Sequence, residues 1–409
     1  MISPEVIAPR LPWDPADPYP FYEECRQAGE VVWDDTAQAW LVVSYQAARQ
    51  VLGGPQWSSD PSANPVARAA MDPVTREFSR HSMLVTDGAV HQRLRGSVRD
   101  VFTRSFVAGL KDGIDAVTSA VIGHAPKDAV FDFMSEIALP IPVSIIAEWL
   151  GLPPRTADAL RELSPAIIRM LGTLADTEEV RAGAAASAEL MAEFLPLAAD
   201  RRTHPRDDLL SFIATDPDLD LEDIVTTAIL IAVAGHETTA NLLGAGLIRL
   251  LTLQPDGTRL ADQIDVGDPA VITELLRLDC PVQAAARTPT QDTTIGAMNI
   301  PAGSTALIVV AAANRDPAAF EHPQTFRHDR RGPAPLTFGY GAHHCLGANL
   351  ARLEISAALP KILARQPVVA GTTTWRDTPA IRGPQTMPIT FHETNKRGSP
   401  RFEGWRLGE

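Results

Sequence analysis

The stretch that decides the fold of this 409-residue chain is Phe338-Gly339-Tyr340-Gly341-Ala342-His343-His344-Cys345-Leu346-Gly347. Its alternate glycines predict a tight, kinked turn that directs backbone N–H groups inward. Cys345 lies where this turn enters a helix, and the positive end of a helix favours a thiolate. Surrounding N–H groups would tune a metal bound to the sulfur. Gly347 leaves space for a flat ligand close to the helix.

Other interpretations of Cys345 have to be weighed. A lone cysteine is most often a small buried hydrophobic residue. His343 and His344 suggest zinc, but one cysteine beside two histidines lacks the spacing of a four-ligand site. A planar metal cofactor held by one thiolate fits the glycines better, and haem with an axial cysteine is the known chemistry of that kind.

Composition limits the classes of protein that remain. With 45% hydrophobic residues, the chain has enough apolar material for a large core, which excludes intrinsic disorder as its main state. Its 36 basic and 50 acidic residues give a net charge of −14, which argues against non-specific binding to nucleic acid or anionic membranes. We see no signal peptide and no apolar run near the roughly 20 residues of a membrane helix. We therefore expect a cytoplasmic protein without a membrane anchor.

Two helices are marked by their caps. Asp220 is a good N-cap with Asp223 in the capping-box position, and the helix that follows continues to Leu253. Its centre is apolar nearly all round, which is typical of a helix in the middle of a large protein. Asp268 caps a second helix, which Pro281 ends.

The remaining elements are shorter. We expect a core of helices packed on helices, since helical periodicity dominates from about Ala89 to Leu253. Pro55–Pro73 shows no periodicity and is interpreted as a long loop with at most one short helix. The predicted strands are Val31–Trp33, Trp40–Val43, Thr293–Ile295, Thr305–Val310 and Pro388–His392, and further helices are expected over Tyr45–Leu52 and Leu346–Arg365.

The segment from Phe338 to Gly347 resembles the haem-binding signature of the cytochromes P450, Phe-Gly-x-Gly-x-His-x-Cys-x-Gly, and meets every specified position. The resemblance covers about Asp14 to Glu393. It implies a mainly α fold with a smaller β portion, a single triangular domain over residues 1–393 and a surface tail over 394–409. The haem would be buried between the central helix and the helix that carries Cys345.

Glu274-Leu275-Leu276-Arg277 matches the family's Glu-x-x-Arg, and spacing of three puts both side chains on one helix face. Taken alone, such a pair is usually an ordinary surface ion pair. The resemblance implies a buried pair that supports the proximal side of the haem, with Arg330 as its third member.

Ala234-Gly235-His236-Glu237-Thr238-Thr239 matches the family's oxygen-binding motif. A mid-helix glycine and threonines that bond to the preceding turn favour a local widening of the helix. Gly235 could instead serve close packing and Glu237 could be a solvated charge, but a carboxylate among apolar neighbours needs a role or a partner. The resemblance implies that Thr238 contacts the bound oxygen and that Glu237 relays protons.

His91 and Arg95 resemble the family's His-x-x-x-Arg, whose side chains face the haem propionates; Arg287 and His343 match the other propionate-binding positions. The usual double proline before the histidine is replaced by Gly88-Ala89. Lone arginines and histidines are usually just solvated, so these assignments depend on Cys345. The residues expected to bind the cofactor are thus His91, Arg95, Ala234, Gly235, Arg287, Phe338, Gly339, His343, Cys345 and Gly347.

The resemblance implies a monooxygenase that inserts one atom of O₂ into a hydrophobic small molecule such as a terpenoid, sterol, fatty acid or polyketide. Its cofactor would be haem b, since no Cys-x-x-Cys-His attachment motif exists. Electrons would come from a ferredoxin and its NAD(P)H-dependent reductase, docked over Cys345 near Arg93, Arg99, Arg104 and Arg352. The implied pocket residues are Met83, Leu84, Val233, Val282, Ala285 and Thr386. Two alternatives stay open: a peroxide-driven or phenol-coupling haem-thiolate enzyme, and a non-catalytic haem protein that binds a ligand.

Overall fold

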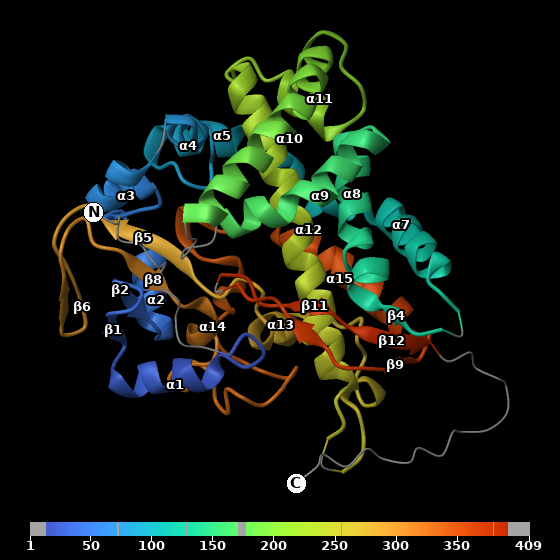
Figure 1. Cartoon of the computed structure of the whole chain (residues 1–409). Coiled ribbons are helices and arrows are strands. Elements are labelled where there is room, and N and C mark those ends of the chain that lie inside the picture. The colour runs from blue at the N-terminus through green and yellow to red at the C-terminus, as the bar shows by residue number, and fades with distance from the viewer. Residues whose placement is uncertain are drawn as a thin grey trace, which may run out of the picture.

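Helix α12 (Leu221–Leu251) runs through the middle of the molecule (Figure 1). Its predicted start is confirmed: the Asp220 side chain accepts a hydrogen bond from the Asp223 N–H, and Asp223 reciprocates toward the Asp220 N–H. Most of its side chains are buried, as expected for a helix that is apolar nearly all round. The computed structural model describes residues 14–391 apart from 72, 128, 171–176, 255 and 379, so the predicted tail lies outside the described residues.

Helices surround α12 and make up most of the described chain. They are α1 (Tyr19–Ala28), α2 (Tyr45–Gly53), α3 (Pro65–Ala70), α4 (Pro73–Arg80), α5 (Gly88–Arg99), α6 (Arg104–Ala108), α7 (Lys111–His124), α8 (Pro140–Leu150), α9 (Pro154–Met170), α10 (Thr177–Thr203), α11 (Leu209–Ala214), α13 (Pro269–Leu278), α14 (Val310–Ala313) and α15 (Ala348–Leu363). Helices α8, α9, α10 and α15 all pack against α12. No helix in the described part of the chain has both the length and the apolar character needed to cross a membrane.

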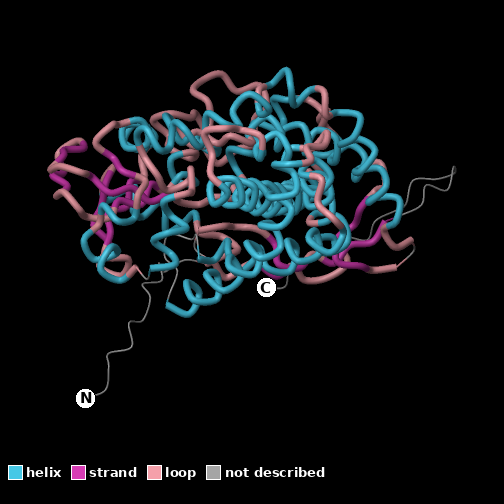
Figure 2. The backbone as a smooth tube through the Cα atoms, turned by 90° about the horizontal axis from the view of Figure 1, so that it is seen from above, coloured by secondary structure: helices cyan, strands magenta, loops and turns pink. Residues whose placement is uncertain are grey.

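Strands gather on one side of the helices and in a smaller group near the C-terminal part (Figure 2). The main sheet has the order β1-β2-β8-β5-β3, in which only β2 and β8 run parallel. Its strands are β1 (Val31–Asp34), β2 (Ala39–Val42), β3 (Trp57–Ser58), β5 (Ala285–Pro289) and β8 (Ala306–Ile308). The other strands are β4 (Phe131–Asp132), β6 (Thr293–Ile295), β7 (Met298–Ile300), β9 (Pro367–Val369), β10 (Thr374–Trp375), β11 (Pro384–Thr386) and β12 (Pro388–Phe391).

Two hydrophobic clusters fill the interior. The larger one lies among α12 and the helices packed on it, as the expected helix-on-helix core. The smaller one lies between the main sheet and helices α1, α2 and α14. The core is therefore helix on helix in one part and helix on sheet in the other. This mainly α architecture with a smaller β portion confirms the predicted fold class.

The segment predicted as a long loop is more ordered than expected. Between Pro55 and Pro73 the chain forms β3, a short 3-10 turn and α3, and α4 follows directly. Asn64 caps α3 by accepting hydrogen bonds from the N–H groups of Val66 and Ala67, and Pro65 occupies the first helical turn. The strand predicted over Thr305–Val310 is shorter in the structure, where β8 ends at Ile308 because the chain enters α14 at Val310.

Candidate functional site

The Cys345 loop is built from two short 3-10 turns, Leu336–Phe338 and Gly341–His343. Gly339 and Gly341 adopt φ angles of 73° and 78°, which confirms the predicted kinked turn. The Cys345 N–H donates to the Phe338 carbonyl at 2.7 Å and closes the loop. Gly347 then starts α15 as its N-cap.

Neighbouring elements fix this loop in place. A Cβ on Gly341 would lie 2.6 Å from the Leu52 carbonyl oxygen, so the loop packs directly against the end of α2. The Tyr340 hydroxyl accepts a hydrogen bond from Arg49 of the same helix. On the other side, Arg352 of α15 lies 5.1 Å from the Phe338 ring centre and donates to Thr273. The position of the sulfur is therefore set by α2, α13 and α15 together.

Cys345 combines two properties of a residue that lines an internal hollow. Its side chain is accessible to solvent, unlike Cys25 and Cys280, yet protein surrounds it on most sides and that burial raises the pKa of the Cys345 thiol. The Gly347 N–H and the charge of Arg95 act in the opposite direction but do not outweigh burial. A metal bound to the sulfur would deprotonate it outright.

An open face on α12 accompanies the exposed cysteine. In the middle of this buried helix Ala234 is exposed, and Leu230, Gly235 and Thr238 are half-buried. Positions 230, 234 and 238 share one face because they are four residues apart. The predicted widening is absent, because α12 is a continuous α-helix through this region. The expected threonine bonds do form: Thr238 and Thr239 donate to the carbonyls of Ala234 and Gly235 at 3.2 and 3.5 Å.

The four residues predicted to face haem propionates come together. His91, Arg95, Arg287 and His343 all line one cavity of about 820 Å³. The His91 and His343 ring centres are 4.1 Å apart. The His91 Nε2 atom is buried and has no hydrogen-bond partner among the described residues. Burial first, then the charges of His343 and Arg95, lower the pKa of His91 to about 4. These donors, together with the guanidinium groups of Arg95 and Arg287, suit an anionic ligand.

Arg95 links this cavity to the cysteine. Its guanidinium donates to the His344 carbonyl at 2.6 Å, and it is close enough to Cys345 for the two groups to affect each other's pKa. Burial lowers the pKa of Arg95 and that of Arg287. At Gly347 a Cβ would meet no atom within 4 Å, which leaves open space beside the sulfur. An iron-bearing planar group with two carboxylates fits these donors.

Asp87 is a residue of this cavity that the sequence analysis missed. Its carboxylate accepts hydrogen bonds from the Ser58 hydroxyl and the Ser59 N–H and lies 3.2 Å from His343 Nε2. Burial acts to raise the pKa of Asp87, but these hydrogen bonds and His343 lower it to about 2. Its place four residues before His91, the first residue of the His91-x-x-x-Arg95 pattern, was the signal that the sequence offered.

Glu274 and Arg277 form a buried, two-pronged ion pair on α13. Arg277 Nη2 and Nε lie 2.7 and 2.8 Å from the two Glu274 carboxylate oxygens. The structure also brings Arg330 to this pair, with its Nε 3.0 Å from Glu274 Oε1. The side chain of Arg277 is only 1% exposed, which excludes an ordinary surface pair. The carbonyl oxygens of Asn314, Pro323 and Thr325 accept further hydrogen bonds from Arg277.

The predicted substrate-pocket residues are less uniform. Leu84 is exposed, and Val282, Ala285 and Thr386 are half-buried. Met83 and Val233 instead belong to the main hydrophobic cluster, with exposures of 6% and 1%. Val233 points into the core because it lies off the face that carries Leu230, Ala234 and Thr238. The structure therefore does not bring Met83 and Val233 to an open surface.

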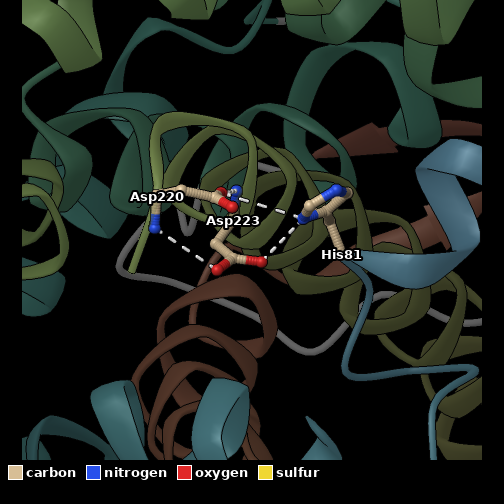
Figure 3. Close-up of side chains that lie close together, drawn as sticks. All are labelled: His81, Asp220 and Asp223. Atoms are coloured by element: carbon tan, nitrogen blue, oxygen red, sulfur yellow. Dashed lines mark hydrogen bonds and ion pairs between the residues drawn. The ribbon is translucent and has the colours of Figure 1, made fainter. Parts of the chain in front are cut away.

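A second polar cluster, which the sequence analysis missed, joins three helices (Figure 3). His81, just after α4, places Nδ1 2.7 Å from Asp223 Oδ1 and 3.8 Å from Asp220 Oδ1. Arg93 of α5 binds the other Asp223 oxygen. Because Asp223 is thus engaged by two side chains, the cluster is an ion-pair junction, and Arg93 is not free for the predicted docking face.

Comparisons with known proteins agree with this geometry. The profile of the family described as "Cytochrome P450" matches residues 269–372. Cytochrome P450 monooxygenase PikC of Streptomyces venezuelae is 33% identical over 401 residues, covering 94% of this chain and 93% of that protein. Vitamin D(3) 25-hydroxylase of Pseudonocardia autotrophica is 33% identical over 368 residues, with coverages of 86% and 88%.

Solved structures show the same likeness. A crystal structure of P450BioI in complex with hexadec-9Z-enoic acid ligated acyl carrier protein superposes with a TM-score of 0.85 and 26% identity. The superposition covers 92% of this chain and 99% of the P450BioI chain. The likeness thus extends over both the helical and the sheet-rich parts.

Proposed function

Because the chain belongs to the cytochrome P450 family and is a monooxygenase of that family, we propose that Cys345 ligates the iron of haem b and that the substrate is a sizeable hydrophobic molecule. The observation that carries the haem assignment is the cavity shared by His91, Arg95, Arg287 and His343. Three separate parts of the sequence supply these donors, and a dianionic group would satisfy them together.

The residues that would hold the cofactor have different roles. Cys345 would supply the thiolate that binds the iron, and Gly347 and Ala234 would leave space for a flat group. The propionates would accept hydrogen bonds from the four cavity residues, including the unpaired His91 Nε2. Glu274, Arg277 and Arg330 stiffen the segment that leads to the cysteine, because Arg277 joins α13 to the carbonyls of Asn314, Pro323 and Thr325.

The haem, when bound, supplies the activation of O₂ and the transfer of one oxygen atom to the substrate. The protein's part is to exclude water and to deliver protons. Thr238 is half-buried on the open face of α12, where its hydroxyl can exchange its bond to the Ala234 carbonyl for one to a ligand. Glu237 is the adjacent acid, 1% exposed, and is proposed to pass protons toward Thr238.

A hydrophobic substrate is supported by the apolar character of the open face, formed by Leu230 and Ala234. Two of the similar proteins are named with a sterol-like molecule, vitamin D(3), and with a fatty acyl group on a carrier protein. A compound in that size range fits the proposal, and its position of oxidation would depend on residues around Leu84, Val282 and Thr386.

Members of the family take electrons from a redox partner, and we propose a ferredoxin with its NAD(P)H-dependent reductase. Arg99 and Arg104 are exposed, which supports a positive docking face despite the net charge of −14. Arg352 contributes less, since it is half-buried against Phe338. The cytoplasmic location stays a prediction.

The test is spectroscopic. The purified protein should bind haem, and its reduced carbon-monoxide complex should show the strongly red-shifted band of a thiolate ligand. Cys345→Ala should abolish this band, whereas Cys25→Ala, a buried cysteine of the smaller core, should keep it. Retention of the band by Cys345→Ala would contradict the assignment. A fatty acid, a sterol and a macrolide should then be compared for the shift they cause in the haem absorption band.

A further inference from the structure

One stripe of α12 is covered jointly by the β10–β11 hairpin and by the helical turn Met134–Ala138. Glu237, Asn241 and Gly244 are spaced by four and three residues and so share this stripe. The hairpin approaches closely at two points: a Cβ on Gly244 would lie 3.0 Å from Pro384, and a Cβ on Gly383 would lie 2.2 Å from the Asn241 side chain. The hairpin backbone therefore lies directly over the Glu237 side of the helix.

This contact encloses several unsatisfied polar atoms. Both Glu237 oxygens and both polar atoms of the Asn241 amide are buried without a well-aligned hydrogen bond in the described structure. The Nε atom of Arg376, the residue after β10, is also buried without a hydrogen bond in the described structure. Buried polar atoms in such number are normally satisfied by ordered water, which needs a polar site with several partners. The stripe thus groups enough buried polar atoms to offer ordered water the several partners it needs.

Arg376 connects this group of buried polar atoms to solvent. Its Nη1 lies 3.1 Å from Glu237 Oε2, while its side chain is 22% exposed against 1% for Glu237. The Arg376 N–H donates to the Gly383 carbonyl at 3.1 Å, which ties the arginine to the hairpin segment that contacts Asn241. His236, on the neighbouring face, is no competing cation, since burial lowers its pKa.

We propose that Arg376 is a positioning residue for Glu237: it holds the carboxylate ionised at the inner end of a hydrated pocket beneath the β10–β11 hairpin, and protons reach the site through this pocket. The inference deepens the proposed function and rests on it, because it assumes that Glu237 relays protons. A buried carboxylate is costly without a partner, and the Arg376 guanidinium supplies one to Glu237.

The proton balance of the step is simple. A proton from bulk water moves along the water beside Arg376 and binds a Glu237 oxygen, which weakens the ion pair. The neutral carboxyl group then gives that proton to the Thr238 hydroxyl oxygen while this hydroxyl passes its own proton to a group on the open face of α12. Glu237 thereby returns to the guanidinium as a carboxylate. Arg376 keeps its own protons throughout, as arginine does. No oxidant or reductant takes part.

The first test is infrared spectroscopy of the haem-loaded protein at neutral pH. Arg376→Gln should show the C=O stretching band of a protonated carboxyl that the wild type lacks, and Arg376→Gln/Glu237→Gln should lose it again. Arg376→Lys, which keeps the charge, should show no band. The matched control is Arg382→Gln, since Arg382 packs on Trp375 of the same hairpin and pairs with Asp279. Absence of the band in Arg376→Gln overturns the proposal.

The second test is O₂ consumption with NADPH and saturating spinach ferredoxin and reductase, in H₂O and D₂O from pH 6 to 9. Arg376→Gln should slow consumption at least tenfold, increase the solvent isotope effect and shift the pH profile, while Arg376→Lys recovers most of the rate. Adding Glu237→Gln to Arg376→Gln should slow it no further. If Arg376→Gln consumes O₂ like the wild type while Glu237→Gln is slow, the role of Arg376 is overturned and the role of Glu237 stands. Wild-type behaviour of Glu237→Gln itself overturns the relay assumed above.

Discussion

Replacing Arg277 by methionine tests how much the buried ion pair of α13 contributes to stability. The substitution removes two hydrogen bonds to Glu274 and those to the carbonyls of Asn314, Pro323 and Thr325. Among the described residues, Glu274 would keep Arg330 and the Arg327 N–H as its partners. Loss of one partner of a buried pair costs about 3–5 kcal/mol, and we expect a decrease of that size in the free energy of unfolding.

The chain offers a matched control. Glu178 and Arg181 have the same i,i+3 spacing and the same 2.7 Å separation, but their side chains are 77% and 72% exposed. Arg181→Met should therefore cost at most about 1 kcal/mol. Both variants would be unfolded in urea and followed by far-UV circular dichroism. Similar costs for Arg277→Met and Arg181→Met would refute the argument that burial, rather than the pairing itself, sets the contribution.

Three further predictions follow from the site. Thr238→Ala should fold normally but release more peroxide per electron consumed, which a peroxide assay during turnover measures. The control is Thr239→Ala, which should not release more peroxide, because the Thr239 side chain is buried. Burial acts to lower the pKa of His81, but Asp223 raises it overall, so the stabilisation it provides is complete below about pH 6.5 and is lost as pH rises through the raised value. The difference in unfolding free energy between wild type and His81→Gln should thus be larger at pH 6 than at pH 9; an equal difference would count against it. Gly341→Ala should lower the free energy of unfolding, because residue 341 has a φ of 78° and lies close to the Leu52 carbonyl. Gly347→Ala should fold normally but lose haem faster, and haem transfer to apomyoglobin measures this rate.

Local signals in the sequence determined much of this fold. The cap residues Asp220 and Asp268 predicted where α12 and α13 begin, because a cap acts on N–H groups only two or three residues away. The Cys345 loop was predictable for the same reason, since Gly339 and Gly341 impose its turns locally. Asn64-Pro65 carried an equally local start signal for α3, and that signal was overlooked within a segment lacking periodicity.

Contacts between distant segments were decided by tertiary structure. The sequence alone determined that His91, Arg95, Arg287 and His343 were candidates for one ligand, but only the packed chain shows that they line one cavity.

The pairing of Glu237 with Arg376 had no signal in the sequence at all. It depends on the β10–β11 hairpin lying against α12, which in turn requires Gly244 and Gly383 to leave space for the hairpin. Caps and turns act over a few residues, so the sequence specifies them directly. Which side chains meet across 139 positions of chain (237 to 376) is set by the packing of the whole core.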